Sequence, residues 1–66
     1  MLQGTVKFFD ATRGFGFISR SDGPDVFVHV SNLAPASGGA LSDGQAVEFE
    51  IGQGRKGDEA RNVRPA

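Results

Sequence analysis

Apolar residues recur at every second position in this chain, and no stretch of helical length repeats them every three or four residues. A period of two is typical of a β-strand with one buried face. Runs of this kind, rich in Val, Phe, Ile and Thr, span residues 3–10, 15–20, 25–29, 46–53 and 59–64. We therefore expect an all-β fold of five short antiparallel strands.

The segments between these runs have the composition of turns and loops. "TRG" and "SDGPD" favour hairpin turns, one short helical turn is expected at residues 31–33, and residues 33–44 are rich in Gly and Pro. The chain shows no internal repeat and no linker, so residues 1–66 are expected to form a single domain. Five strands with one long surface loop favour a small closed or nearly closed barrel.

The length of 66 residues restricts how such a barrel is stabilised. A chain this short buries only about 60% of the surface that its unfolded form exposes, and many small domains add disulfides or a metal. Here there is no Cys and only one His, which excludes a disulfide and a tetrahedral zinc site built by this chain alone. Packing alone is expected to hold the fold, with no metal and no cofactor.

Cysteine usage and hydropathy also indicate a location. A chain without Cys is compatible with a reducing compartment, and no apolar run reaches the length of a signal-peptide core or a membrane span. We expect a cytoplasmic protein without a membrane partner.

The formal net charge is −1, which does not by itself favour a polyanionic partner, but residues 1–20 carry three bases against one acid.

Alternation assigns the side chains of the strands to two faces. In residues 46–53, Val47 and Phe49 face one way and Glu48 and Glu50 the other, whereas both faces are apolar in residues 15–20 and 25–29. Strands apolar on both faces are normally buried between two layers. This chain is too short to supply a second layer, so one aromatic face is expected to remain exposed. The expected interior consists of Leu2, Val6, Ile18, Val26, Val28, Val47, Phe49, Ile51 and Val63.

The outward residues of the second and third runs form the candidate binding surface. Pairing of these runs makes Phe15, Phe17, Phe27 and His29 cross-strand neighbours, and an exposed apolar cluster on a small protein marks an interaction site. Single-stranded nucleic acid offers bases that stack on aromatic rings, at about 1–3 kcal/mol for each base, and phosphates that attract cations. The cations expected around the rings are Lys7, Arg13, Arg55 and Lys56.

Five segments resemble, in order, the signatures of the bacterial cold-shock protein family. They are "KFFD" at 7–10, "RGFGFI" at 13–18, "DVFVHVS" at 25–31, "LSDGQAVEFEI" at 41–51 and "ARNV" at 60–63. The resemblance covers essentially the whole chain. It implies a five-stranded OB-type barrel that binds single-stranded RNA and DNA with low sequence specificity and acts as an RNA chaperone, without catalysis and without a small-molecule substrate. We expect a monomer; a dimer swapped by opening residues 34–43 is the alternative.

The resemblance also assigns roles to individual residues. It implies base stacking by Phe8, Phe15, Phe17, Phe27 and His29, and polar contacts to the nucleic acid by Lys7, Arg13, Asp25 and Lys56. For Asp25, turn chemistry explains the residue equally well.

Phe8 is the one stacking residue that alternation does not support. Regular alternation from Val6 would turn Phe8 inward and Phe9 outward, whereas the family pattern places position 8 on the binding face. A β-bulge after Lys7 would reconcile the two, with Phe9 partly buried at the edge of the aromatic face.

Four positions depart from the family pattern. Phe8 stands where Trp is usual, Val30 and Gly38 stand where aromatic residues are common, and Asp10 stands where Asn is common. Fewer rings are available for stacking, so we expect weaker binding and fewer bases held than in relatives that carry those aromatic residues.

Three other interpretations of the sequence compete with these. Gly52, Gly54 and Gly57 spell G-x-G-x-x-G, but no helix follows them, so a flexible hairpin loop is expected and not a dinucleotide site. His29 with Ser31 or Asp25 would suggest a general base, but an exposed sheet offers no pocket, and no catalytic residue is expected. The remaining alternative is a protein-interaction module whose Phe cluster docks an apolar partner.

Overall fold

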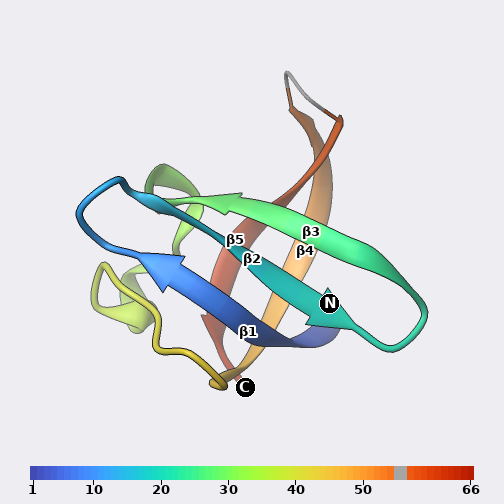
Figure 1. Cartoon of the computed structure of the whole chain (residues 1–66), viewed down its shortest axis with the longest axis horizontal. Helices are drawn as coiled ribbons and strands as arrows, with labels where there is room; N and C mark the ends of the chain where they lie inside the picture. Colours follow the sequence, from blue (N-terminus) through green and yellow to red (C-terminus); the bar gives the residue numbers. More distant parts are fainter. Residues whose placement is uncertain (55–56) are drawn as a thin grey trace.

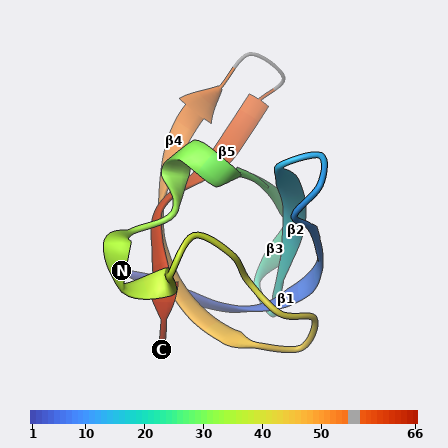
Figure 2. The ribbon, with the colours of Figure 1, turned by 90° about the vertical axis from the view of Figure 1, so that its left-hand side faces the viewer.

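A computed structural model describes residues 1–54 and 57–66 of the chain. Its elements in order are β1 (Leu2–Asp10), β2 (Phe15–Arg20), β3 (Gly23–His29), the 3-10 helices η1 (Val30–Asn32) and η2 (Pro35–Ser37), β4 (Ala46–Gly54) and β5 (Gly57–Pro65). The strands close into a barrel in the order β1-β2-β3-β5-β4, with β4 beside β1 (Figure 1). Figure 2 shows the strands surrounding the interior, with the segment between β3 and β4 at one end of the barrel. The predicted five-stranded OB-type barrel is thereby confirmed.

One strand pair differs from the antiparallel arrangement that the sequence predicts. β3 and β5 run parallel, with Phe27 beside Glu59 and Val28 beside Ala60, while the other four neighbouring pairs are antiparallel. The reason is geometric, because strand direction cannot alternate all the way round a closed ring with an odd number of members. A closed five-stranded barrel must therefore contain at least one parallel pair.

Most of the predicted interior residues are buried in the barrel. Leu41 and Ala34, from the segment between β3 and β4, are buried too, so part of the predicted surface loop belongs to the core. Ala34 is fixed there, since its N–H donates to the carbonyl of Val63 at 2.7 Å. The core cluster consists of Val6, Ile18, Val26, Val28, Leu41, Val47, Phe49, Ala60 and Val63.

Two residues expected inside are instead exposed. Leu2 and Ile51 are 37% and 36% exposed. Leu2 is the first residue of β1, at the barrel end. Ile51 pairs with the buried Ala60, so it faces the correct side, but the pairing of β1 with β4 ends at Phe49, two residues before Ile51. Beyond the barrel, β4 and β5 project as a two-stranded hairpin (Figure 1). Alternation predicts the direction of a side chain but not whether another strand covers it.

The register between neighbouring strands shifts at three places, one of them where Pro24 and Asp25 of β3 together oppose a single residue of β2. In β1 the register with β2 shifts between Val6 and Phe8, which makes Lys7 the extra residue and turns Phe8 outward, as the family pattern requires. In β5 the residues Asn62 and Val63 together oppose one residue of β4, and Asn62 has a left-handed φ of 53°, a conformation that Asn tolerates. The predicted bulge after Lys7 is therefore confirmed.

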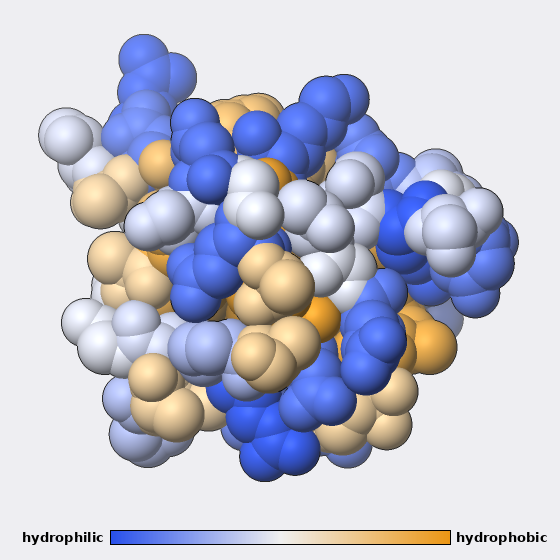
Figure 3. Space-filling model, turned by 90° about the horizontal axis from the view of Figure 1, so that it is seen from below, coloured by the Kyte–Doolittle hydropathy of each residue, from blue (hydrophilic) through white to orange (hydrophobic). Residues whose placement is uncertain are grey.

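The remaining surface is mixed in character. Seen from below, hydrophilic residues cover much of the molecule, and apolar atoms show in separate patches between them (Figure 3). Within residues 1–54 and 57–66, no helix has the length and hydropathy needed to cross a membrane.

Candidate nucleic-acid interface

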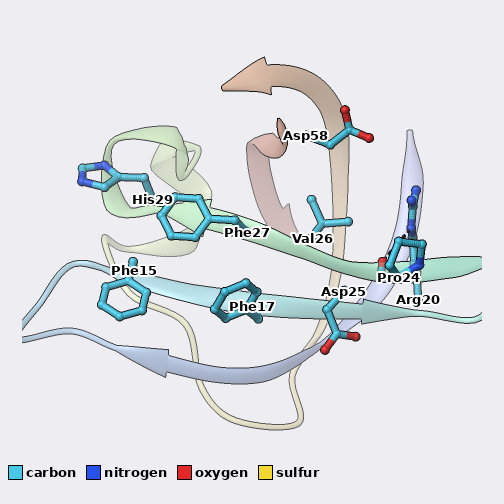
Figure 4. Close-up of a pocket in the computed structure, with 9 residues that line it drawn as sticks. All are labelled: Phe15, Phe17, Arg20, Pro24, Asp25, Val26, Phe27, His29 and Asp58. Atoms are coloured by element: carbon cyan, nitrogen blue, oxygen red, sulfur yellow. Dashed lines mark hydrogen bonds between the residues drawn. The ribbon is translucent and has the colours of Figure 1, made fainter. Parts of the chain in front are cut away.

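Two rows of side chains cross the outer face of the barrel over β1, β2 and β3. The strand register places Phe8 beside Phe17 and Phe17 beside Phe27 in one row, and Phe15 beside His29 in the other. Because residues two apart in a strand share a face, Phe15 and Phe17 of β2 point the same way as Phe27 and His29 of β3. Figure 4 shows these four side chains on one side of the sheet.

The Phe rings of the two rows form a closed cycle in which each ring contacts two others. The centroids of Phe8 and Phe17 are 5.6 Å apart, those of Phe17 and Phe27 5.8 Å, those of Phe27 and Phe15 5.9 Å, and those of Phe15 and Phe8 6.3 Å. These separations lie within the favourable range for aromatic pairs. We call Phe8, Phe15, Phe17 and Phe27 the aromatic platform. Phe8 is 38% exposed and the other three rings are half-buried, so the platform is open to solvent.

His29 lies beside Phe15 at the end of β3, and its ring orientation is fixed by the chain that follows. The backbone N–H of Ser31 donates to Nδ1 of His29 at 3.1 Å, which caps η1. A nitrogen that accepts this bond carries no hydrogen in the neutral ring, so the hydrogen resides on Nε2. The exposed imidazole therefore presents a donor at its other edge. The 2.8 Å contact between Nδ1 and Ser31 Oγ is part of the same local cap.

Lys7 and Asp25 form an ion pair beside the platform. Lys7 Nζ lies 3.0 Å from Asp25 Oδ2, although β2 separates their strands, and the two side chains are 62% and 37% exposed. An exposed pair of this kind contributes at most about 1 kcal/mol to stability. Its larger effect is on the surface, because the cation expected to attract phosphate is partly neutralised.

Arg13 has a similar arrangement in the turn between β1 and β2. Oδ1 of Asp10 accepts the backbone N–H groups of Thr12 and Arg13 at 3.0 and 3.1 Å, and Oδ2 lies 3.7 Å from Nε of Arg13. Asp10 therefore holds the turn and pairs with its cation. The predicted roles of Lys56 and Arg55 fall outside the residues that the structure describes.

An open hollow of about 600 Å³ lies over the aromatic rows. Its floor is apolar, and polar groups stand at its edge where sequence reasoning did not place them: Arg20 at the end of β2 and Asp58 on β5 (Figure 4). Arg20 could have been identified from the sequence, because it is the cation at the end of a strand that carries two Phe residues. Asp58 could not, because only the parallel pairing of β3 with β5 brings it there. The lining residues are Phe15, Phe17, Arg20, Pro24, Asp25, Val26, Phe27, His29 and Asp58.

The described part of the chain contains no group of three or more His, Cys, Asp or Glu side chains suited to holding a metal ion. Among the described residues, the site consists of four Phe rings, one imidazole and a border of mixed charge.

Comparison with known proteins gives consistent matches over the whole chain. Residues 2–66 match the family model described as the "'Cold-shock' DNA-binding domain". The chain is 51% identical over 67 residues to "Cold shock protein ScoF" of Streptomyces coelicolor and 50% identical over 66 residues to "Cold shock protein CspC" of Bacillus subtilis, with 100% of both chains covered in each case. It is 46% identical over 63 residues to a "Cold shock-like protein" of Thermotoga maritima, covering 96% of each chain.

Proposed function

The chain belongs to the cold-shock domain family, and from this membership and the geometry of the platform we propose that it binds single-stranded RNA and DNA with low sequence specificity. The observation that carries the proposal is the cycle of four Phe rings, 5.6 to 6.3 Å apart and open to solvent, with His29 beside it. Bases of a single strand have free faces for such rings, whereas a duplex stacks its bases on one another.

Stacking, more than phosphate attraction, provides the affinity in this proposal. Lys7 and Arg13 each lie within 4 Å of a carboxylate, which compensates two of the cations that border the described part of the platform; Arg20, at the edge of the hollow, donates from Nε to the carbonyl of Pro24. A stacked base contributes about 1–3 kcal/mol whatever its identity, which gives tolerant binding. Val30 is an exposed aliphatic residue, and a Cβ on Gly38 would have nothing within 4 Å, so neither position extends the stacking surface. We infer weaker binding than in relatives with aromatic residues there.

Binding of this kind supports an RNA-chaperone role in the cytoplasm, because a protein that holds unpaired bases opposes the re-formation of RNA structure. We infer binding without catalysis. The imidazole of His29 is tied at Nδ1 by the backbone of Ser31, and the rings form an open surface and not a pocket around a reacting group. A monomer is sufficient for the activity, since all four rings come from one barrel.

Fluorescence anisotropy with one labelled oligonucleotide, free and annealed to its complement, tests the proposal. We expect the single strand to bind at least about tenfold more tightly than the duplex, and its affinity to fall steadily with added salt. Equal affinity for the two forms would contradict stacking on the platform. An apolar protein partner would bind with almost no response to salt, and failure of both nucleic acids to bind would favour that alternative.

A further inference from the structure

The row of rings that crosses β1, β2 and β3 does not end at Phe27. The parallel pairing of β3 with β5 places Glu59 beside Phe27, and Glu59 in turn pairs with Gly52 of β4. One row of the outer face therefore carries three rings followed by a carboxylate. Glu59 lines a second hollow together with Phe27, His29, Ser31 and Asn32, which continues the first along β3.

The carboxylate of Glu59 is held in place by two neighbours. Nδ2 of Asn32 donates to Oε1 at 3.2 Å in a partly buried contact. On the other side, the side chain lies over Gly54, where a Cβ would overlap Oε2 and the carboxylate carbon. Gly54 therefore acts as the seat of this side chain, and Oε2 makes no hydrogen bond among the described residues. The two glycines of β4 that the sequence suggested as a hairpin loop belong to a strand, with the side chains of Glu59 and Arg61 lying over them.

We propose that Glu59 makes the platform discriminate between pyrimidines, favouring cytosine over uracil or thymine. Because Glu59 lines the same hollow as Phe27 and His29, a base stacked at these two residues lies next to the carboxylate, whose oxygens only accept hydrogen bonds. Cytosine offers the N4 amino group as a donor, and a carboxylate is a suitable partner for it. Uracil and thymine present the O4 oxygen at the same position, so two acceptors face each other. The inference rests on the proposed binding of single strands to the platform.

Oligonucleotides of deoxycytidine and deoxyuridine, about seven nucleotides long, isolate the effect because both bases stack with a similar area and neither carries a methyl group. We expect the protein to bind oligo-dC about fivefold or more tightly than oligo-dU at neutral pH, measured by fluorescence anisotropy. Glu59→Gln keeps an oxygen for Asn32 to bond and should reduce this ratio to about one or two, since the amide presents a donor as well as an acceptor.

Two further variants separate recognition from charge. Glu50→Gln also removes one carboxylate charge, but from β4, which β5 separates from the rings. It should change the affinities for oligo-dC and oligo-dU by the same factor and leave their ratio unchanged. Gly54→Ala keeps the charge of Glu59 but displaces its side chain, so the ratio should fall as it does in Glu59→Gln.

Equal binding of both oligonucleotides by the unmodified protein, or a ratio that Glu59→Gln leaves unchanged, would overturn the inference and leave the proposed function intact. Absence of binding to either oligonucleotide would overturn the proposed function and the inference together.

Discussion

Replacing Phe17 with Leu tests whether the platform acts through its rings or only through apolar area. Phe17 contacts two other rings, at centroid distances of 5.6 Å to Phe8 and 5.8 Å to Phe27. Leucine keeps a large apolar side chain but removes the flat face on which a base stacks. With a loss of about 1–3 kcal/mol for one stacked base, affinity should fall about 5- to 150-fold.

The same substitution also affects stability, and the structure supplies the control for this. Phe17→Leu removes two aromatic pairs, each of which contributes about 0.5–1.5 kcal/mol, so the unfolding free energy should fall by at most about 1–3 kcal/mol. The actual loss should be smaller because Phe17 is only half-buried. Phe49 is fully buried in the core and contributes no ring to the platform. Phe49→Leu makes the identical chemical change at a cost of about 1–2 kcal/mol in unfolding free energy.

The assay is anisotropy titration of a labelled single strand, at a temperature where urea unfolding shows both variants to be folded. Phe17→Leu should lose affinity and Phe49→Leu should keep it within about twofold, although both lose similar stability. Retained affinity in Phe17→Leu, or an equal loss in both variants, would refute stacking on this ring.

Three further changes have defined outcomes. Val30→Phe places a ring beside His29 and should tighten binding of the same labelled strand about fivefold or more in that assay; unchanged affinity would show that position 30 lies off the path of the bases. Asp25→Asn frees the ammonium of Lys7 and should steepen the dependence of log affinity on log salt by up to about one unit, whereas Lys7→Ala should not steepen it. Gly16→Ala would drive a Cβ into the backbone of Phe8 and Phe9 and should lower the unfolding free energy by about 1–3 kcal/mol in urea titrations, while a neutral result would mean that β1 can shift at its bulge.

The strands and most of the interior could be predicted because alternation is a local property. It correctly places Val6, Ile18, Val47 and Phe49 inside. Alternation fails where a bulge inserts a residue. The bulge at Lys7 was expected only because the family pattern places position 8 on the binding face, against regular alternation. No such sign existed at Asn62, and the burial of Ala60 together with Val63 follows only from the bulge itself.

The barrel closure illustrates a different limit. No local pattern distinguishes a strand that will pair in parallel, yet five strands in a closed ring require at least one parallel pair. The sequence predicted a closed or nearly closed barrel of antiparallel strands, and only full closure makes a parallel pair necessary. What the sequence could not supply is its location, and that location brings Asp58 and Glu59 of β5 to the edge of the aromatic rows.

In the candidate site, the positions of the rings could be predicted from the sequence, but the partners of the charged residues could not. The rings follow from strand parity and one bulge, so the structure brings the expected aromatic residues together. The partners of the charges depend on side-chain reach across strands, as in the 3.0 Å contact of Lys7 with Asp25 across β2. Counting bases near the rings overestimates the positive field, because carboxylates occupy the positions beside two of them.

This balance of charge has a consequence for recognition. Where many free cations border a stacking surface, phosphate attraction adds the same affinity for every sequence and reduces the relative weight of base contacts. Here Lys7 and Arg13 are paired, and the acceptor nearest to Phe27 in the row is the fixed carboxylate of Glu59. A chain that relies on stacking for affinity therefore gives each hydrogen bond at a base edge a larger share of the binding free energy. Because the phosphate contribution is the same for both pyrimidines and cancels in the ratio of their affinities, the discrimination proposed for Glu59 is expected to persist although the overall binding is weaker.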